Sequence, residues 1–329
     1  MLWVLFAFAS IVAVIGLISL YCFRECFYSG KNRQQDPYAV LEGEQYTAVT
    51  QRIHACTARM DAVEYEWVST VSRDGLPLWG RYYHVRDNAP VKLIFHGYRS
   101  PALRDSAGGW LLARKLGFNV LAVDQRAHAR SGGTVISFGI RERHDCLSWV
   151  RYINSRFGNE TPVILCGLSM GAATVLMASG LDLPENVAAI LADSPYSAPA
   201  DIIRKVCRDR HLPDHLAFPF IQLAARIYGN FDLKETTAVE AVKKARVPIL
   251  LLHGEDDRFV PCEMSRLIYN ACTSPAQLQI FPAAGHGLCY ISDPRRYEEV
   301  CTKFLWSIPE LKPYMENNDF VEKELNEHG

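Results

Sequence analysis

The sequence predicts an α/β fold: a mostly parallel eight-stranded sheet with helices on both faces, a small helical cap and an N-terminal transmembrane helix. Two observations lead to this prediction. Short apolar runs alternate with longer helical stretches from about residue 91 onwards, which is typical of a parallel sheet covered by helices. Near the N-terminus, an uninterrupted apolar run has the length of a membrane span.

The composition is that of a globular protein with a sizeable core. The chain has 329 residues, 49% of them hydrophobic, and a formal net charge of −1. Lys and Arg form no dense cluster, which argues against a nucleic-acid partner. The 10 cysteines are scattered without C-x-x-C pairs, so they indicate neither a zinc site nor a disulfide scaffold. So many unpaired thiols favour a reducing compartment for the folded part.

The apolar run covers residues 2–23 without a charged side chain. About 20 apolar residues span a bilayer as a helix, so we expect a single membrane anchor. A cleaved signal peptide would need a basic start and small residues at its end, and this run has neither. Arg24, Lys31 and Arg33 follow the run, and this positive bias predicts that the folded domain is cytoplasmic. A buried core helix is the alternative interpretation.

The next elements connect the predicted anchor to the folded domain and begin its sheet. Residues 31–60 are predicted to be a polar linker that leads to a packing helix, with weak helical patterning over residues 46–59. Residues 66–72 and 78–84 are β-rich runs, and the Asp74-Gly75 turn between them predicts an antiparallel hairpin.

The parallel part of the sheet follows. Six strands are predicted over residues 91–95, 119–123, 163–166, 188–192, 247–252 and 277–281. Helices are predicted between them over residues 107–116, 140–157, 171–179, 265–271 and 294–307. The interval of about 200–246 places several helical pieces between two strands, as a cap over the sheet would. We therefore expect an anchor (1–30), a linker and packing helix (31–60), an α/β domain (61–310) and a polar, fraying C-terminal tail (311–329).

The sharpest local signal is a Gly-x-Ser-x-Gly turn between a strand and a helix: Gly167-Leu168-Ser169-Met170-Gly171. Such a turn is so tight that glycine is needed on both sides, and it exposes the serine hydroxyl above the sheet. The helix that begins there points backbone N–H groups at charge developing on a substrate oxygen. A structural serine in a tight turn is the alternative, and we expect Ser169 to be a nucleophile.

A serine hydroxyl needs a base at neutral pH, and histidine is suited because its reference pKa is about 6.5. His286 lies between Gly285 and Gly287, just after the last predicted strand, where a short loop can bring the imidazole over the strand ends. We expect His286 to be the base. The competing histidines are His96, His128, His144 and His253.

An acid that orients the base should lie between the serine and the histidine in this kind of fold. Asp257 is the choice, because it follows a strand and precedes Val260-Pro261, which starts the next helix. Glu255 and Asp256 fit the turn itself, and Asp193, at the end of an earlier strand, is a weaker alternative.

Two backbone amides should complete the site. The Met170 N–H follows the nucleophile, and Tyr98 N–H follows a strand that ends in His96-Gly97, so we expect these two to form the oxyanion hole. We expect His96 to hold that loop. The charged loop of residues 124–133 either shapes the pocket floor or pins neighbouring loops, and we favour the structural role.

These motifs together resemble the α/β-hydrolase superfamily, and within it the serine-aminopeptidase-like or BEM46-like membrane-anchored hydrolases. The resemblance covers about residues 61–307 and rests on five ordered motifs: residues 96–97, 124–126, 167–171, 253–261 and 285–287. It departs at Ala127 and Ala129, where relatives often carry glycine. The resemblance implies hydrolysis of an ester, thioester or amide through an acyl-enzyme, without a metal or organic cofactor.

Two other functions stay open on the sequence: a non-catalytic, membrane-tethered binding protein with this fold, and an acyltransferase that uses the same three side chains. The expected substrate is a small-molecule or lipid-like acyl compound. Apolar side chains of the cap could form an acyl-binding roof or simply pack the cap on the core; they are Leu216, Phe218, Phe220, Ile221, Leu223 and Ile227.

Overall fold

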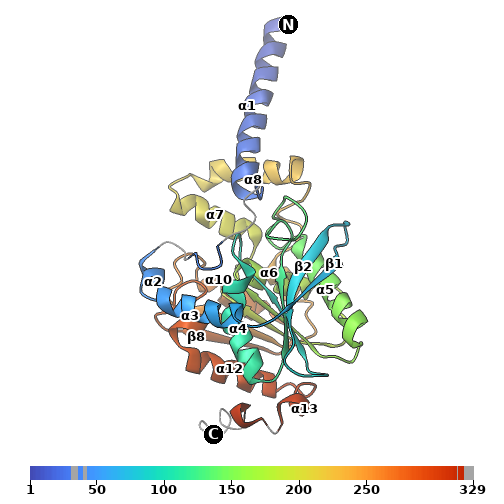
Figure 1. Cartoon of the computed structure of the whole chain (residues 1–329). Helices are drawn as coiled ribbons and strands as arrows, with labels where there is room; N and C mark the ends of the chain where they lie inside the picture. Colours follow the sequence, from blue (N-terminus) through green and yellow to red (C-terminus); the bar gives the residue numbers. More distant parts are fainter. Residues whose placement is uncertain (31–35, 40–42, 317, 322–329) are drawn as a thin grey trace.

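The computed structural model describes residues 1–30, 36–39, 43–316 and 318–321 (Figure 1). Lys31 and Arg33, which entered the membrane-orientation argument, lie outside these residues, as do residues 322–329 of the predicted tail. One sheet of eight strands has the order β1-β2-β4-β3-β5-β6-β7-β8. The strands are β1 (Glu66–Val71), β2 (Pro77–Tyr83), β3 (Val91–Phe95), β4 (Asn119–Asp124), β5 (Val163–Leu168), β6 (Val187–Asp193), β7 (Ile249–Gly254) and β8 (Ala276–Phe281).

The sheet has the predicted mixture of strand directions. β1 and β2 form the antiparallel hairpin, β2 pairs antiparallel with β4, and all other neighbours are parallel. The α/β fold and the hairpin are therefore confirmed. Because β3 to β8 run in the same direction, their carboxyl ends meet at one edge, where loops from distant parts of the sequence can converge.

Helices cover both faces. They are α1 (Leu2–Cys26), α2 (Glu44–Thr47), α3 (Thr50–Asp61), α4 (Ala102–Lys115), α5 (Glu142–Phe157), α6 (Met170–Ala178), α7 (Pro199–Asp209), α8 (Asp214–Ile227), α9 (Ala238–Val242), α10 (Glu263–Ala271), α11 (Cys289–Ser292), α12 (Pro294–Trp306) and α13 (Lys312–Met315). α11 and α13 were not predicted, and two of the predicted helices differ clearly from the expectation. The helix expected over 46–59 is broken into α2 and α3, where Val49 N–H bonds back to the Tyr46 carbonyl three residues earlier. α4 begins five residues earlier than expected, directly after Pro101.

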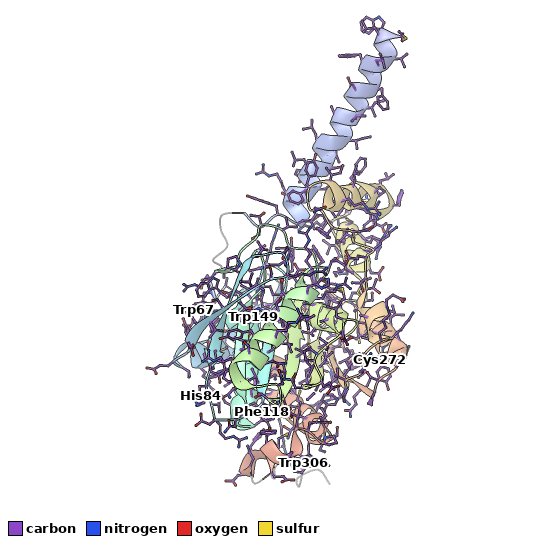
Figure 2. All side chains as sticks on the ribbon, turned by 90° about the vertical axis from the view of Figure 1, so that its right-hand side faces the viewer. Trp67, His84, Phe118, Trp149, Cys272 and Trp306 are labelled. Atoms are coloured by element: carbon purple, nitrogen blue, oxygen red, sulfur yellow. The ribbon has the colours of Figure 1, made fainter. Side chains whose placement is uncertain are left out.

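The two faces of the sheet carry separate hydrophobic clusters. On β3, Leu93 and Phe95 pack with α5, α6 and α10, whereas Ile94 packs with α4 and α12. This alternation is the period-two pattern of a strand buried on both sides. Figure 2 shows how densely side chains fill the domain around the sheet, with Trp149 and Phe118 among them.

The cap and the N-terminal helix lie together. α7, α8 and α9 join β6 to β7, as expected for residues 200–246, and α1 projects away from the domain with α8 crossing near its base (Figure 1). The Tyr228 hydroxyl, after α8, donates to the Gly16 carbonyl of α1 at 3.0 Å. Phe27, just after α1, is fully buried and packs edge-on against Phe138 and Phe231. The 25 residues of α1 have a mean hydropathy of 2.5 in their most apolar window, enough by length and composition to cross a membrane.

Part of the C-terminal segment packs on the domain, although a fraying tail was expected. Met315 and Val321 are buried on the α4 and α12 face, and Asn318 donates to the Lys115 carbonyl at 3.0 Å. The described residues 311–316 and 318–321 therefore pack on the folded domain, because apolar side chains among them, Leu311, Met315 and Val321, reach its core.

Candidate active site

The Gly-x-Ser-x-Gly motif forms the expected strand-to-helix turn. Ser169 lies between β5 and α6 with φ of 55°, a left-handed conformation that L-residues adopt only under constraint. A Cβ on Gly167 would lie 2.2 Å from the Gly171 carbonyl carbon, and one on Gly171 would lie 2.0 Å from the Phe95 carbonyl oxygen. Both glycines are thus required by main-chain contacts, and the turn lies against the end of β3.

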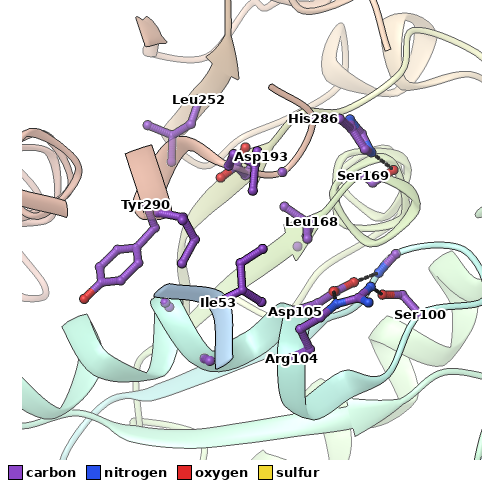
Figure 3. Close-up of a pocket in the computed structure, with 18 of the residues that line it drawn as sticks. Ile53, Ser100, Arg104, Asp105, Leu168, Ser169, Asp193, Leu252, His286 and Tyr290 are labelled. Atoms are coloured by element: carbon purple, nitrogen blue, oxygen red, sulfur yellow. Dashed lines mark hydrogen bonds and ion pairs between the residues drawn. The ribbon is translucent and has the colours of Figure 1, made fainter. Parts of the chain in front are cut away.

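Three residues from distant parts of the chain meet at this turn. His286 Nε2 lies 2.9 Å from Ser169 Oγ, and His286 Nδ1 lies 2.7 Å from Asp257 Oδ2 (Figure 3 shows the first contact). Each of the three is less than a tenth exposed. With Nδ1–H donating to the carboxylate, Nε2 is left to accept the serine proton.

The four acidic candidates occupy different environments. Asp257 is buried next to His286, whereas Glu255 and Asp256 are exposed on the turn. Asp193 is buried and accepts a hydrogen bond from the Ser194 hydroxyl at 2.9 Å, and burial raises its pKa. Of these four, Asp257 is the one that contacts the imidazole.

The Asp257 carboxylate is held in its ionised form by its surroundings. Burial alone would raise its pKa, but the adjacent His286 and His253 lower it well below the usual range. Oδ1 accepts the Val260 and Phe259 amides at 2.7 and 3.0 Å. The loop after β7 therefore fixes the carboxylate with two amide donors, and Nε2 of His253, a competitor for the role of base, lies 3.2 Å from its other oxygen.

The N-terminal segment contributes a contact that the sequence analysis missed. The Tyr46 hydroxyl of α2 donates to the His286 carbonyl at 3.1 Å. A Cβ on Gly285 would lie 2.0 Å from Gln45 Oε1, so α2 packs directly on the histidine loop. Nothing in the linker sequence signals this contact, because it depends on where a short helix docks.

The segments that carry the expected oxyanion donors lie next to the serine. Met170 is the first residue of α6, and the Gly97 main chain passes so close that a Cβ there would lie 3.6 Å from Ser169 Cβ. The Gly97 N–H donates to Asp105 Oδ2 at 2.8 Å, which fixes the turn before Tyr98. The Tyr98 hydroxyl donates to the Cys26 carbonyl at 2.9 Å and so connects this loop to the end of α1.

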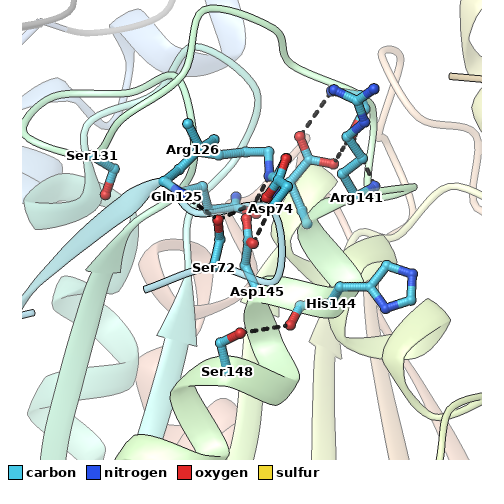
Figure 4. Close-up of polar contacts among 12 residues, drawn as sticks. Ser72, Asp74, Gln125, Arg126, Ser131, Arg141, His144, Asp145 and Ser148 are labelled. Atoms are coloured by element: carbon cyan, nitrogen blue, oxygen red, sulfur yellow. Dashed lines mark hydrogen bonds and ion pairs between the residues drawn. The ribbon is translucent and has the colours of Figure 1, made fainter. Parts of the chain in front are cut away.

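His96 and the 124–133 loop are structural, as expected. His96 Nε2 accepts the Gln125 amide at 3.0 Å and its Nδ1 donates to the Gly97 carbonyl at 2.8 Å. The buried Arg126 guanidinium binds the Asp145 carboxylate at 2.6 Å and Asp74 at 2.9 Å (Figure 4). This loop therefore connects the β1–β2 turn to α5.

Ala127 and Ala129, where relatives often carry glycine, both have positive φ, of 62° and 37°. This chain accepts the left-handed conformation without glycine.

A cavity of about 610 Å³ opens beside Ser169. Figure 3 shows that it extends from Ser169 and His286 past Leu168 and Asp193 towards Tyr290. Its volume is typical of a small-molecule site. None of the six apolar cap residues considered as a roof lines it; Phe218 and Ile221 instead pack in the core. Lining residues not anticipated from the sequence include Tyr46, Lys92, Arg104, Asp105 and Arg210.

Over residues 1–30, 36–39, 43–316 and 318–321, the structure shows no group of three or more His, Cys, Asp or Glu side chains that could hold a metal ion.

A mostly parallel sheet with a serine at a strand-to-helix turn and a histidine after the last strand defines an α/β hydrolase. The model of the Alpha/beta hydrolase family matches residues 93–300, and the chain belongs to this family. Its relatives include the uncharacterized protein YqkD of Bacillus subtilis, 26% identical over 226 residues (68% of this chain, 74% of that one). The bem46 protein of Schizosaccharomyces pombe is 22% identical over 256 residues, which cover 74% of this chain and 77% of bem46. The predicted family resemblance is confirmed.

Solved structures of the same fold include an esterase from Pyrococcus furiosus. It is 21% identical to this chain with a TM-score of 0.63, over 75% of this chain and 92% of the esterase. At that identity the likeness concerns the fold. The family and these neighbours support a hydrolase.

Proposed function

We propose that this chain is a serine hydrolase that cleaves an ester, thioester or amide bond through an acyl-enzyme intermediate. Ser169 is the nucleophile, His286 the general base, Asp257 the acid that orients it, and the Tyr98 and Met170 amides form the oxyanion hole. The observation that carries the proposal is the continuous pair of contacts, 2.9 Å from Ser169 to His286 and 2.7 Å from His286 to Asp257.

The reaction follows from these contacts. Ser169 Oγ attacks the substrate carbonyl carbon while His286 Nε2 takes the hydroxyl proton, and the two amides bind the oxyanion. The protonated imidazole then gives its proton to the leaving alcohol, thiol or amine as the bond breaks. A water molecule, deprotonated by the same nitrogen, attacks the acyl-enzyme and releases the acid and the serine.

The test is a matched pair of serine variants. Ser169→Ala should abolish turnover of a p-nitrophenyl acyl ester and labelling by a fluorophosphonate probe, since the attacking atom is gone. Ser155→Ala, which removes the hydroxyl of an exposed serine on α5, should leave both unchanged. Undiminished turnover by Ser169→Ala would reject the mechanism.

The two alternatives give different results. A non-catalytic binding protein would neither turn over esters nor label, whereas an acyltransferase would label but form product faster when an alcohol or thiol acceptor is added. The intact buried line of three side chains favours catalysis, because binding alone does not require a base aligned with a hydroxyl.

The substrate class proposed is a small-molecule or lipid-like acyl compound. One relative, the lysophosphatidylserine lipase ABHD12 of Rattus norvegicus, is 28% identical over 196 residues, which cover 56% of this chain and 45% of the lipase. The proximity of α1 to the cap supports a substrate that reaches the cavity from a membrane. Activity against acyl esters of graded length and against aminoacyl amides would test this, and a preference for short, soluble esters would contradict a lipid-like substrate that comes from a membrane.

We further propose that residues 1–30 anchor the protein in a membrane and that the domain of residues 61–310 lies on the cytoplasmic side. Arg24 at the end of α1 supports this side. Protease added outside intact cells should leave the domain uncut, and protease added to inverted vesicles should digest it; the opposite pattern would reverse the orientation.

A further inference from the structure

Lys92 lies in the middle of the sheet. It belongs to β3, between β4 and β5, where every residue is buried, and only 2% of its own surface is exposed. Strand alternation places it on the same face as Ile94, under α4. Lysine is almost never buried to this extent unless it is paired, so its position requires an explanation.

The ammonium group has few partners for such a position. Nζ donates to the Gly109 carbonyl of α4 at 3.2 Å, and no ion pair joins it to a carboxylate in the described parts of the chain. A lysine ammonium has three N–H donors. Taking a charged group out of water with one neutral acceptor is unfavourable, and a bound anion would remove that penalty.

Two consecutive glycines lie at this place. Gly108 and Gly109 lie inside α4, although glycine weakens a helix interior. A Cβ on Gly108 would lie 2.7 Å from the Tyr290 ring, and one on Gly109 would lie 3.5 Å from Lys92 Nζ. Gly108 therefore lets the Tyr290 ring lie against the helix, whereas a Cβ on Gly109 would make only an ordinary contact with the lysine head.

Lys92 and the nucleophile belong to one cavity. Lys92, Gly108 and Gly109 line the same 610 Å³ space as Ser169 and His286. Lys92 pairs with Ile164 of β5, which lies five residues before Ser169. Along the strand direction, the Cα atoms of Lys92 and Ser169 are therefore roughly 16 Å apart. Most of the wall on the sheet side is apolar: Ile94, Cys166, Leu168, Leu191 and Leu252.

The carboxylates of the cavity do not neutralise Lys92. Asp105 accepts the Gly97 amide at 2.8 Å and pairs with Arg104 at 3.2 Å. Asp193 accepts the Ser194 hydroxyl at 2.9 Å. Arg210 adds a further cation to the lining. The cavity thus combines an apolar passage with a positive charge remote from the nucleophile.

We propose that Lys92 is an anion-binding residue at the far end of the substrate cavity, and that the substrate is an ester whose acyl chain ends in an anionic group, a carboxylate or a phosphate. This proposal rests on the proposed serine hydrolase function. The apolar passage holds the chain, the ammonium binds its charged end, and the scissile carbonyl is thereby placed at Ser169. Lys92 acts as a specificity-determining residue, since it does not touch the reacting atoms.

The kinetic test compares p-nitrophenyl octanoate with the mono-p-nitrophenyl ester of suberic acid, whose acyl chain has the same length and a terminal carboxylate. The full-length enzyme should prefer the suberate ester in kcat/KM. Lys92→Met, which keeps the stem and removes the charge, should lower kcat/KM for the suberate ester about 10- to 100-fold, the range of a charge-assisted hydrogen bond. Any change on the octanoate should be smaller, so that the ratio of the two kcat/KM values falls.

Lys244→Met is the matched control, because Lys244 is exposed and removal of its charge should leave the ratio of the two substrates unchanged. A ratio that Lys92→Met also leaves unchanged would overturn the proposal. Shorter and longer dicarboxylate half-esters, the adipate and the sebacate, should show a length optimum for the wild-type enzyme that is absent in Lys92→Met.

A binding experiment separates this proposal from the catalytic one. Ser169→Ala protein, full-length in a nonionic detergent, should bind suberate or octyl phosphate by calorimetry, and the double variant with Lys92→Met should bind at least about 10-fold more weakly. The ligand that binds more tightly shows whether the site prefers a carboxylate or a phosphate. If this protein binds an anion through Lys92 but the wild-type enzyme turns over no ester, the anion site is supported and the hydrolase function is rejected. If the wild-type enzyme turns over esters but this protein binds neither anion, the hydrolase function is supported and the anion site is rejected.

A stability measurement excludes a purely structural lysine. If Lys92 binds an anion of the substrate, its charge is uncompensated in the ligand-free protein. Replacing Lys92 by methionine should then leave the midpoint of thermal unfolding of the ligand-free protein unchanged or raise it. Suberate or octyl phosphate should raise the midpoint of wild type and not that of Lys92→Met. A large drop in the midpoint of Lys92→Met, with no ligand effect on wild type, would contradict the proposal.

Discussion

The Asp257 carboxylate and the His286 imidazole meet through Oδ2 and Nδ1 at 2.7 Å, although one follows β7 and the other follows β8. The same oxygen lies 3.2 Å from Nε2 of His253, which also bonds the Val260 carbonyl. One oxygen is thus shared by two imidazoles, and this arrangement leads to the first prediction.

Asp257→Asn should lower kcat on a p-nitrophenyl ester by about 10³- to 10⁴-fold with little change in KM, because an amide at this position favours the wrong tautomer of His286. Asp256→Asn, on the exposed neighbour, should retain activity close to wild type. If the two variants behave alike, Asp257 is not the orienting acid. Steady-state kinetics with circular dichroism as a folding control are sufficient.

The turn at Ser169 gives a prediction about stability. Gly171→Ala places a methyl group 2.0 Å from the Phe95 carbonyl oxygen, which belongs to a central strand and cannot move away. Overpacking of this kind should lower the free energy of unfolding by about 3 kcal/mol. Urea denaturation measures it.

Gly30→Ala is the matched change, since its added Cβ would meet only the Tyr28 ring at 3.8 Å, an ordinary contact. It should shift the urea midpoint little. Equal effects of the two substitutions would show that the serine turn tolerates a side chain.

Much of this arrangement was predictable from local patterns. Ser169, Asp257 and His286 each follow a short apolar run, and parallel strands bring such positions to one edge. The contacts made by Tyr46 and Lys92 were not predictable in this way. Tyr46 contacts His286, 240 residues later in the sequence, because α2 docks on the histidine loop. Lys92 interrupts an apolar strand, and the sequence contains this signal, but its meaning depends on how α4 and the cavity lie above it.

The buried arginine of the 124–133 loop should matter for stability and not for chemistry. Arg126 joins Asp145 and Asp74 through four hydrogen bonds. Arg126→Met leaves the buried Asp145 without its cation and should cost about 3–5 kcal/mol of unfolding free energy. The double variant with Asp145→Leu should recover part of this loss, and at a temperature where the variants stay folded, KM should equal that of wild type. A double variant no more stable than the single one would contradict this account.

The N-terminal helix predicts how the protein divides between membrane and soluble fractions. Deletion of residues 2–15 leaves residues 16–26, which keep the contact with Tyr228 but are too short to span a bilayer, since about 20 residues are needed. The shortened chain should appear in the carbonate-extracted fraction and keep its esterase activity. The full chain should stay with the membrane, and a full chain released by carbonate would mean that α1 does not span it.

The pH dependence of stability should reveal the buried His128. Burial, with the neighbouring His96 ring 4.7 Å away, lowers the pKa of His128 to about 3. Its Nε2 accepts the Arg99 amide at 3.0 Å and its Nδ1 donates to the Arg126 carbonyl at 2.9 Å, so both nitrogens are used by the neutral ring. The unfolded chain binds a proton on this group below its reference pKa of about 6.5, whereas the folded protein does so only near pH 3.

Stability is therefore fully present above pH 6.5 and falls as the pH drops towards 3, by up to about 1.4 kcal/mol per pH unit for this group. His128→Asn should be less stable than wild type at pH 7, because two hydrogen bonds change, but it should lose less on going from pH 7 to pH 5. Ser155→Ala, which removes no titrating group, should keep the wild-type slope. Urea titrations at both pH values measure the slopes, and equal slopes for wild type and His128→Asn would mean that the folded protein accommodates the charged ring.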